Sequence, residues 1–445
     1  MINVFSDELT PRIQYSFRLV FETILNNKVQ FFQNEEDFKN CKGVKINYSD
    51  KNEIDGLYLK PSGLLNQHHL EVQYPDIFIW DEEPAFFPVE SSFLPFDIFS
   101  ASFYLVSRYE EYLPGKRDSH QRFNARNSCA VHNNFLEKPL VNIWALKMAQ
   151  LIKNTYPEID FIPSQFQYIP TIDIDNAWAF KNKGFVRISL SIIKDLVKGR
   201  FKLLKIRLAV VNRIEDDPYD SYSFMKQIFQ EYNFRPIFFF LLNSKGKHDR
   251  SLSYKNSAYR NLIVRMSKVG EIGAHPSYAS SANRSEKQLG IEISRLKSIT
   301  EKEVKYSRQH YLKFTMPTTY RRLLSNGIEA DYSMGYPSRP GFRASIATPF
   351  YFFDVLKNET TRLTVYPFQV MDVTLLHYRN MRAADASKKI EKLILETARV
   401  GGTFISLWHN ESLNDNGHWN GWQTVYTQMT QFAADLRDGK NTTPS

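Results

Sequence analysis

Acidic, histidine and arginine side chains recur in the second half of the sequence, at or just after the ends of short apolar runs. Carboxylates and imidazoles are ligands for Zn²⁺ and similar divalent ions, and both can also move a proton during hydrolysis. Seven residues share this position: Asp173, Asp175, His275, Arg308, His310, Asp331 and His409.

Brought together, these residues could carry out metal-assisted hydrolysis of an amide or ester. Catalytic zinc sites keep three protein ligands and a water, whose pKa falls from 15.7 in bulk to about 7. A second carboxylate could take the proton of that water, and a histidine opposite could protonate a leaving amine. Taken singly, the same residues have ordinary structural roles. Acids cap helices or close turns, histidines lie satisfied in cores, and arginines form surface ion pairs.

The spacing of apolar residues predicts the elements that must position this chemistry. Strands are expected at 167–172, 236–242, 271–273, 304–308, 328–332, 364–370 and 403–407. Helices are expected at 221–232, 258–269 and 318–324, after a capping pair at Ser285 and Gln288, and around Ile390–Thr397 before Gly401. Alternating strands and helices imply a parallel sheet, open or closed into a barrel, whose strand C-termini gather reactive groups.

At these residues the sequence resembles the polysaccharide deacetylases, the NodB-type family of carbohydrate esterases (family 4). Five segments resemble its motifs, in family order: Thr171-Ile-Asp-Ile-Asp175, Gly273-Ala-His275-Pro-Ser277, Ser307-Arg-Gln-His310, Asp331-Tyr-Ser-Met-Gly335 and Ile405-Ser-Leu-Trp-His409. The resemblance implies a distorted (β/α)7-type barrel and removal of an acetyl group from an N-acetylated sugar.

The resemblance also implies a role for each residue. Asp173 would be the general base, held ionised by Arg308, and His409 the general acid, with Asp331 as its charge partner. Asp175 and His275 would bind the metal, and Leu407 would line the acetate pocket.

One position departs from the family pattern. The second motif usually carries another ligand histidine four residues after the first, and here that residue is Ala279. Because His310 follows the neighbouring strand, we expect it to be the third ligand of one divalent ion, Zn²⁺ by its ligand types. Four aromatic residues flank the expected site and could stack on sugar faces, although aromatic residues more often belong to the core: Trp178, Tyr278, Tyr336 and Trp408.

The length of 445 residues is enough for two or three domains. We expect an accessory α/β domain at residues 1–160 and the barrel at residues 161–440. The segment Ser107-Arg-Tyr-Glu-Glu111 is expected to pack against or pair with the barrel. No Walker A, G-x-G-x-x-G or G-x-S-x-G motif occurs, which argues against nucleotide-cofactor and serine-hydrolase chemistry. Two cysteines are too few for a disulfide framework.

The formal charge of +9 is concentrated in residues 181–213, which hold ten Lys and Arg and one acid, Asp195. Such local charge argues against a nucleic-acid binder. The basic residues alternate with apolar ones, which predicts either a solvated helix face or contact with an anionic membrane or a phosphate-linked glycan carrier. The sequence contains neither a signal-peptide pattern nor a long apolar span, so the expected location is the cytoplasm, peripheral to the inner membrane if this contact exists.

Three functions follow from these patterns. The favoured one is a metal-dependent hydrolase that removes N-acetyl groups from a bacterial surface glycan or its precursor. The second is a catalytically impaired carbohydrate-binding or scaffold protein on the same fold, which the alanine at position 279 would permit. The third is an amide hydrolase for a small non-sugar substrate.

Overall fold

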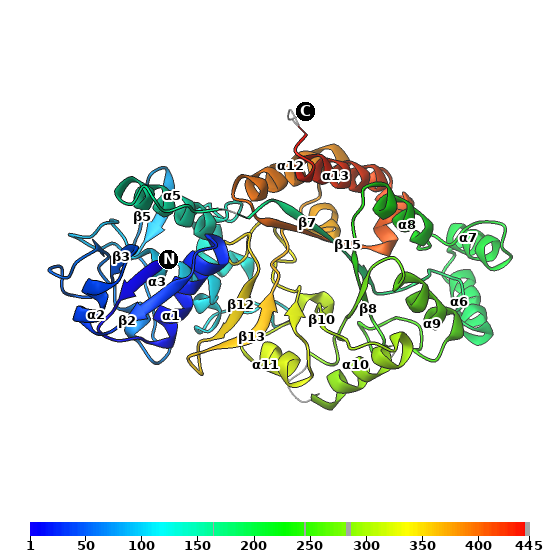
Figure 1. Ribbon diagram of the computed structural model, residues 1–445. Helices are drawn as coiled ribbons and strands as arrows, with labels where there is room; N and C mark the ends of the chain where they lie inside the picture. The colour runs from blue at the N-terminus through cyan, green and yellow to red at the C-terminus, as the bar shows by residue number, and fades with distance from the viewer. Residues whose placement is uncertain (163, 244–245, 282–285, 441–445) are drawn as a thin grey trace.

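The computed structural model describes residues 1–162, 164–243, 246–281 and 286–440, which form an α/β protein with two main sheets (Figure 1). The first sheet is parallel, in the order β2-β1-β3-β4. Its strands are β1 (Ile2–Phe5), β2 (Val29–Phe32), β3 (Val44–Asn47) and β4 (Leu57–Tyr58). A separate antiparallel pair, β5 (Ile77–Trp80) and β6 (Glu83–Phe86), lies beside it.

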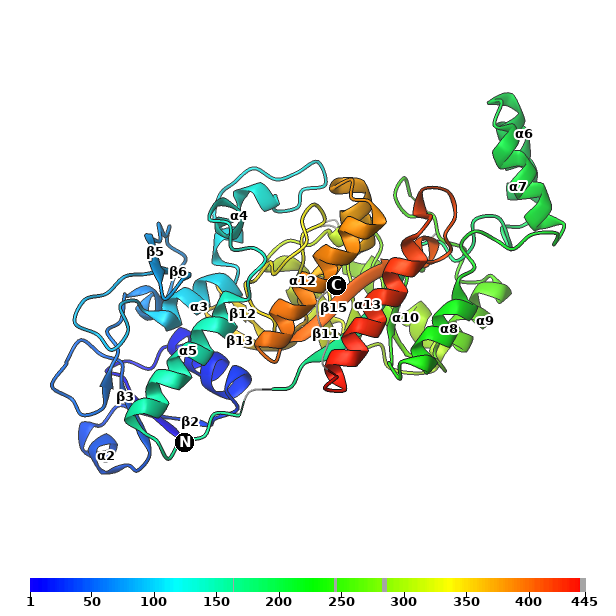
Figure 2. The same ribbon diagram turned by 90° about the horizontal axis from the view of Figure 1, so that it is seen from above.

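The helices of the N-terminal part pack around this sheet, except the short α4, which lies away from it (Figure 2). They are α1 (Pro11–Phe17), α2 (Glu35–Asn40), α3 (Ile98–Val106), α4 (Cys129–His132) and α5 (Leu140–Thr155). Every residue of α3 is buried, as expected for a helix that is apolar all round. Phe17 and Phe99 stack between α1 and α3 with their ring centroids 3.6 Å apart.

The second sheet has nine strands in the order β12-β13-β11-β10-β9-β8-β7-β15-β14. All neighbours are parallel except β12 and β13. The strands are β7 (Gln167–Ile174), β8 (Ile237–Phe240), β9 (Glu271–Ala274), β10 (Tyr306–Ser307), β11 (Ala330–Asp331), β12 (Phe350–Asp354), β13 (Glu359–Val365), β14 (Val370–Met371) and β15 (Thr403–His409).

Alternate side chains along these strands face two different cores. Phe238 and Phe240 of β8, like Trp408 of β15, belong to the large core under the helices. Phe239 of β8 and Leu407 of β15 belong to a second, smaller core, which also contains Tyr332 and Met371 from the far strands. The sheet therefore curls around an interior of its own. Apart from β12, which lies at the edge beside β13, its strands follow chain order as in a barrel. Among the described residues no ladder joins β13 to β14, so closure stays a prediction.

The helices of this part connect successive strands, apart from α13, which follows the last strand; α12 and α13 cover β15 and β7 (Figure 1). They are α6 (Phe185–Val197), α7 (Phe201–Val211), α8 (Tyr222–Glu231), α9 (Ser257–Met266), α10 (Glu286–Thr300), α11 (Thr318–Ser325), α12 (Ala383–Arg399) and α13 (Trp422–Arg437). Among the described residues, no helix combines the length and the apolar character that crossing a bilayer requires.

Most expected elements of the C-terminal part are confirmed, with shorter strands for β10 and β11. The single strand expected at 364–370 is wrong, because the chain forms β13 and β14 with Pro367 between them. A proline cannot donate to a central ladder. The capping pair at Ser285 and Gln288 lies partly outside the described residues.

A buried ionic network joins the N-terminal part to the second sheet, as expected for the charged segment 107–111. Glu111 accepts hydrogen bonds from Arg108 Nε at 2.8 Å and from Arg343 Nη2 at 2.6 Å. Arg108 also donates to the hydroxyl of Tyr336 at 2.9 Å. Arg108, Glu111 and Arg343 are each at most 2% exposed, so this contact is part of the interior.

Candidate metal centre and active site

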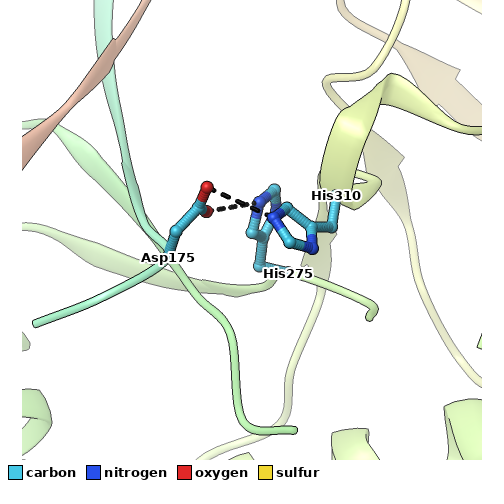
Figure 3. A group of neighbouring side chains, drawn as sticks. All are labelled: Asp175, His275 and His310. Carbon is cyan, nitrogen blue, oxygen red and sulfur yellow. Dashed lines mark hydrogen bonds and ion pairs between the residues drawn. The ribbon is translucent and has the colours of Figure 1, made fainter. Parts of the chain in front are cut away.

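Three of the predicted residues form a compact cluster at the C-terminal ends of neighbouring strands (Figure 3). Asp175 follows β7, His275 follows β9, and His310 lies beyond β10. Nε2 of His275 is 3.0 Å from Oδ1 of Asp175, and Nε2 of His310 is 3.2 Å from Oδ2. One ligand atom from each residue lies within 4.8 Å of the other two, a spacing at which they could hold one cation.

The second nitrogen of each imidazole fixes how the ring is turned. Nδ1 of His275 lies 2.6 Å from the backbone oxygen of Arg308, and Nδ1 of His310 lies 3.0 Å from Oδ1 of Asp249. Because a carbonyl oxygen can only accept, Nδ1 of His275 carries a proton, and in the neutral ring Nε2 then presents a lone pair to the cluster. Metal-binding histidines are commonly held in this way.

Asp249, which the sequence analysis did not identify, supports the cluster from behind. It is 2% exposed and accepts hydrogen bonds from the backbone nitrogens of Tyr278 at 2.8 Å and Ala279 at 3.2 Å. Burial alone would raise the pKa of this carboxyl, but the bonds from His310 and the backbone outweigh burial and lower it. The residue at 279 thus helps to hold a carboxylate through its backbone.

The donor set fits a divalent cation such as Zn²⁺. Oδ1 of Asp175 is buried and receives no hydrogen bond of acceptable geometry, although Nε2 of His275 is close to it. Two acceptors at this distance repel each other unless a cation or an extra proton lies with them. Burial opposes ionisation of Asp175, yet the neighbouring His310 outweighs it and holds the pKa of the carboxyl well below its usual range. Burial opposes protonation of His310, but Asp175 and Asp249 raise its pKa to about 9.

Asp173 and Arg308 form a second group beside the cluster. Nη1 of Arg308 donates to Oδ1 of Asp173 at 3.0 Å and to Oγ1 of Thr171 at 2.7 Å, while Nε donates to the oxygen of Tyr332. The guanidinium lies 4.6 Å from the ring centroid of Phe239. The Phe239 ring can occupy this place only because residue 273 is a glycine, where a Cβ would lie 2.5 Å from the ring. The other oxygen of Asp173 is 3.7 Å from Nε2 of His275.

His409 completes the group from the end of β15. Its Nδ1 lies 2.9 Å from Oδ1 of Asp372, whose Oδ2 accepts the backbone N–H of His409 at 2.8 Å. Its Nε2 is 4.0 Å from Oδ2 of Asp175. Burial would lower the pKa of His409, but Asp372 and Asp175 outweigh it and raise the pKa well above its usual range.

The expectation that Asp331 partners His409 is wrong, because Asp372 has that position. Asp331 is fully buried and accepts hydrogen bonds from Ser307 and Ser333. It therefore joins the ends of β10 and β11 instead of orienting the acid.

A cavity of about 420 Å³ is lined by Asp173, Asp175, His275, His310 and His409. Leu407, as expected, lines it, together with Met371 and Val373 on the apolar side. Its wall also includes polar and aromatic residues that the sequence analysis did not single out: Asn176, Tyr219, His248, Arg250, Tyr311, Tyr378 and Glu411.

Three of the four expected aromatic cleft residues are instead core residues. Trp408 faces the helices, because neighbours on a strand point to opposite faces, and packs against Trp422 and Tyr426. Trp178 is buried with its Nε1 donating to Asp220, and Tyr336 is buried beside Arg108. Tyr278 lies just behind the cavity wall, its ring centroid 4.3 Å from that of His248.

The N-terminal part contributes to the rim of this cavity. Arg122 lines it and donates through Nη1 to the backbone oxygen of Tyr311 at 2.7 Å. Nδ1 of His120 is 3.2 Å from the hydroxyl of Tyr278. Tyr311 itself has a left-handed backbone (φ 60°), a conformation that costs energy in a residue with a side chain. The cleft is thus built from both parts of the chain.

Residues 2–157 match the model of a family of unknown function, DUF7033. No curated protein matches the chain.

Several solved structures align with about three fifths of the chain. A Mycobacterium smegmatis protein assigned to the polysaccharide deacetylases is 13% identical over 64% of this chain and 97% of its own, with a TM-score of 0.39. The polysaccharide deacetylase Bc1974 from Bacillus cereus is 11% identical over 62% and 89%, with a TM-score of 0.30. BA3943, a CE4 family pseudoenzyme from Bacillus anthracis, is 10% identical over 61% and 62%, with a TM-score of 0.30. These values are low, so the function proposed below rests on the geometry of the site.

Proposed function

We propose that this protein is a metal-dependent amide hydrolase that removes N-acetyl groups from an N-acetylated sugar in a bacterial surface glycan or its precursor. The observation that carries the proposal is the arrangement within one cavity. A three-residue cation cluster lies between an Asp173–Arg308 pair and a His409–Asp372 pair. A cation site, a separate base and a separate acid are the parts that amide hydrolysis requires.

Asp175, through its carboxylate, and His275 and His310, through Nε2, would hold the ion. When bound, a divalent ion such as Zn²⁺ supplies a Lewis acid that polarises a carbonyl and makes water more acidic. The backbone oxygen of Arg308 and the carboxylate of Asp249 keep the two rings turned toward this position.

Asp173 would accept the proton of the attacking water. The fully buried Arg308 forms an ion pair with Oδ1 of Asp173 and holds the carboxylate in one orientation, and the rings of Phe239 and Phe368 confine the guanidinium. The second carboxylate oxygen, on the side toward His275, is the one placed to take the proton.

His409 would protonate the departing sugar amine. Asp372 accepts at Nδ1, so the ring's Nε2 proton is directed into the cavity on the Asp175 side. Leu407, Met371 and Val373 form an apolar wall suited to the acetyl methyl group. The rings of Tyr219, Tyr311 and Tyr378 could stack against the sugar.

A scaffold without activity is the second candidate, since Ala279 removes the family's usual histidine. Metal content and acetate release of the purified protein separate the two functions. We expect the wild type to bind one divalent ion and to release acetate from N-acetylglucosamine oligomers.

Two variants and a control make the test specific. We expect His310→Ala to weaken metal affinity by roughly 10- to 100-fold or more, and Asp173→Asn to retain metal while losing about 10²- to 10⁴-fold in rate. His418→Ala, at an exposed histidine, should match the wild type. Metal retained unchanged in His310→Ala would refute the proposed ligand set. Bound metal without acetate release from any acetylated sugar would favour the scaffold.

A further inference from the structure

The segment between the metal cluster and α8 forms a helical hairpin with an unusually apolar surface. Of the twenty exposed large apolar side chains among the described residues, nine lie between 185 and 214. Single exposed apolar residues are ordinary on protein surfaces, whereas a concentration of them in one short segment marks an interaction site.

In α6 these side chains form a continuous stripe. Leu190, Ile193 and Val197 have the spacing i, i+3, i+7 that places residues on one helix face, and they are 62%, 56% and 82% exposed. Basic residues run along the next face, where Lys194 and Lys198 are exposed one position after Ile193 and Val197. Apolar and cationic surface therefore lie side by side along the helix.

The tip of the hairpin repeats this pairing in a few residues. Lys198-Gly199-Arg200 turns the chain, with Gly199 in the left-handed region (φ 63°). Val197 and Phe201 on either side are 82% and 67% exposed, and Lys202 follows. At the tip, the exposed side chains of Val197 and Phe201 thus lie next to the cations Lys198, Arg200 and Lys202.

The hairpin is held together independently of this surface. Asp195, the one acid among residues 181–213, accepts from Nη2 of Arg207 at 2.8 Å and from Nε at 3.0 Å. Both side chains of this pair are mostly buried between the helices. The apolar stripe and the tip are therefore not needed for the packing of α6 on α7.

Figure 2 shows that α6 and α7 project away from the rest of the molecule. They leave the sheet after β7, at the edge that carries Asp175. We propose that this hairpin docks the protein on the surface of an anionic lipid bilayer, with Val197 and Phe201 inserted among the lipids and the surrounding Lys and Arg side chains on their phosphates. Charge alone would suit a soluble polyanion, but the exposed apolar stripe requires an apolar phase, which a bilayer surface offers together with anionic groups.

The test is cosedimentation of the full-length protein with vesicles. We expect binding to phosphatidylcholine vesicles containing phosphatidylglycerol, weak binding to phosphatidylcholine alone, and release at high salt. Replacing four cations (Lys198→Gln, Arg200→Gln, Lys202→Gln, Lys205→Gln) should lower the partition coefficient by on the order of a thousandfold. The pair Val197→Ser and Phe201→Ser should lower it by tenfold or more while keeping the charge.

A matched control removes four charges from exposed lysines elsewhere: Lys28→Gln, Lys226→Gln, Lys268→Gln and Lys302→Gln. It should bind like the wild type, with circular dichroism confirming that all variants are folded. Absence of binding by the folded wild type would overturn the proposal, as would an equal loss in the control. The proposal would also be overturned if sedimentation velocity showed a dimer that the Val197/Phe201 variant dissociates. A second copy of the chain would then cover the apolar face of the hairpin. Because the readout is binding, these results are independent of acetate release.

Discussion

In the proposed metal cluster of Asp175, His275 and His310, each histidine turns one ring nitrogen toward the cluster. The other ring nitrogen faces a buried acceptor behind it. For His310 that acceptor is Asp249, a carboxylate held in turn by two backbone N–H groups. A carboxylate at Nδ1 fixes the ring orientation and makes Nε2 a better donor to a cation. Asp249 therefore acts through His310.

Asp249→Asn should weaken metal binding while preserving the three proposed ligands. We expect an affinity about 10- to 100-fold lower than wild type, because the amide is neutral and supports His310 less well. Titration of the metal-free protein with Zn²⁺ in a competitive chelator measures the change. Asp385→Asn, at an exposed acid, is the control and should bind like the wild type. Equal affinities for all three proteins would contradict a supporting role for Asp249.

The sequence predicted Asp175, His275 and His310 as a cluster because each follows a recognisable strand. Asp249 was missed although Lys247-His248-Asp249-Arg250 lies in the loop after the expected strand 236–242, one of two expected strand ends to which no chemistry was assigned. Asp372 follows the other such strand end, two residues after the expected strand 364–370. Pro367 was the signal that the run breaks, which leaves Asp372 at the end of a strand of its own.

At the scale of elements, strand alternation decides which neighbours reach the site. Leu407 and His409 face the cavity while Trp408 between them packs under α13, so only every second residue of β15 can take part in chemistry. A sequence shows the alternation but not which face is the cavity, because β15 is apolar on both. The short strands β10 and β11 are similarly joined by side chains, with Asp331 accepting from Ser307 and Ser333.

Burial of Asp331 makes the strength of this junction depend on pH. Burial raises the pKa of the carboxyl to about 6, against the opposing hydrogen bonds of Ser333 and Ser307. Between about pH 4 and 6 the native state then binds more protons than the unfolded state, so stability falls as pH rises.

Asp331→Asn should remove this dependence, since an amide does not titrate. The difference in free energy of unfolding, variant minus wild type, should therefore increase by about 3 kcal/mol from pH 4 to pH 7, as measured by urea unfolding. The exposed Asp160→Asn should show no comparable trend against the wild type. A difference between Asp331→Asn and wild type that is constant with pH would contradict the raised pKa.

At the scale of the whole molecule, the two parts of the chain share one interior. The apolar core runs continuously from β1 to α13, and Glu111 lies within it between Arg108 and Arg343. The sequence indicated that the segment around Glu111 contacts the second part, but its charged residues gave no sign of complete burial. The same contact brings Arg122 to the rim of the cavity, so the N-terminal part bears on both stability and the site.

Glu111→Gln should destabilise both parts together. Removing the charge leaves the buried guanidinium of Arg343 poorly compensated, while Arg108 keeps its ion pair with Glu110 at 2.6 Å; the loss costs about 3–5 kcal/mol in urea unfolding. Glu137→Gln is the matched control, because Glu137 also joins the two parts, through Lys389 and Lys392, but is 32% exposed. It should cost about 0–1 kcal/mol.

The pH dependence distinguishes lost charge from lost packing. Burial would raise the pKa of Glu111, but Arg343 and Arg108 outweigh it and lower the pKa to about 2. The stabilisation is therefore complete above the ordinary glutamate value of about 4.3 and is lost as pH falls toward 2. The difference between wild type and Glu111→Gln should narrow over that interval. If the difference in free energy of unfolding stays constant with pH, Glu111 contributes only through its packing. The two arginines would then not depend on its charge.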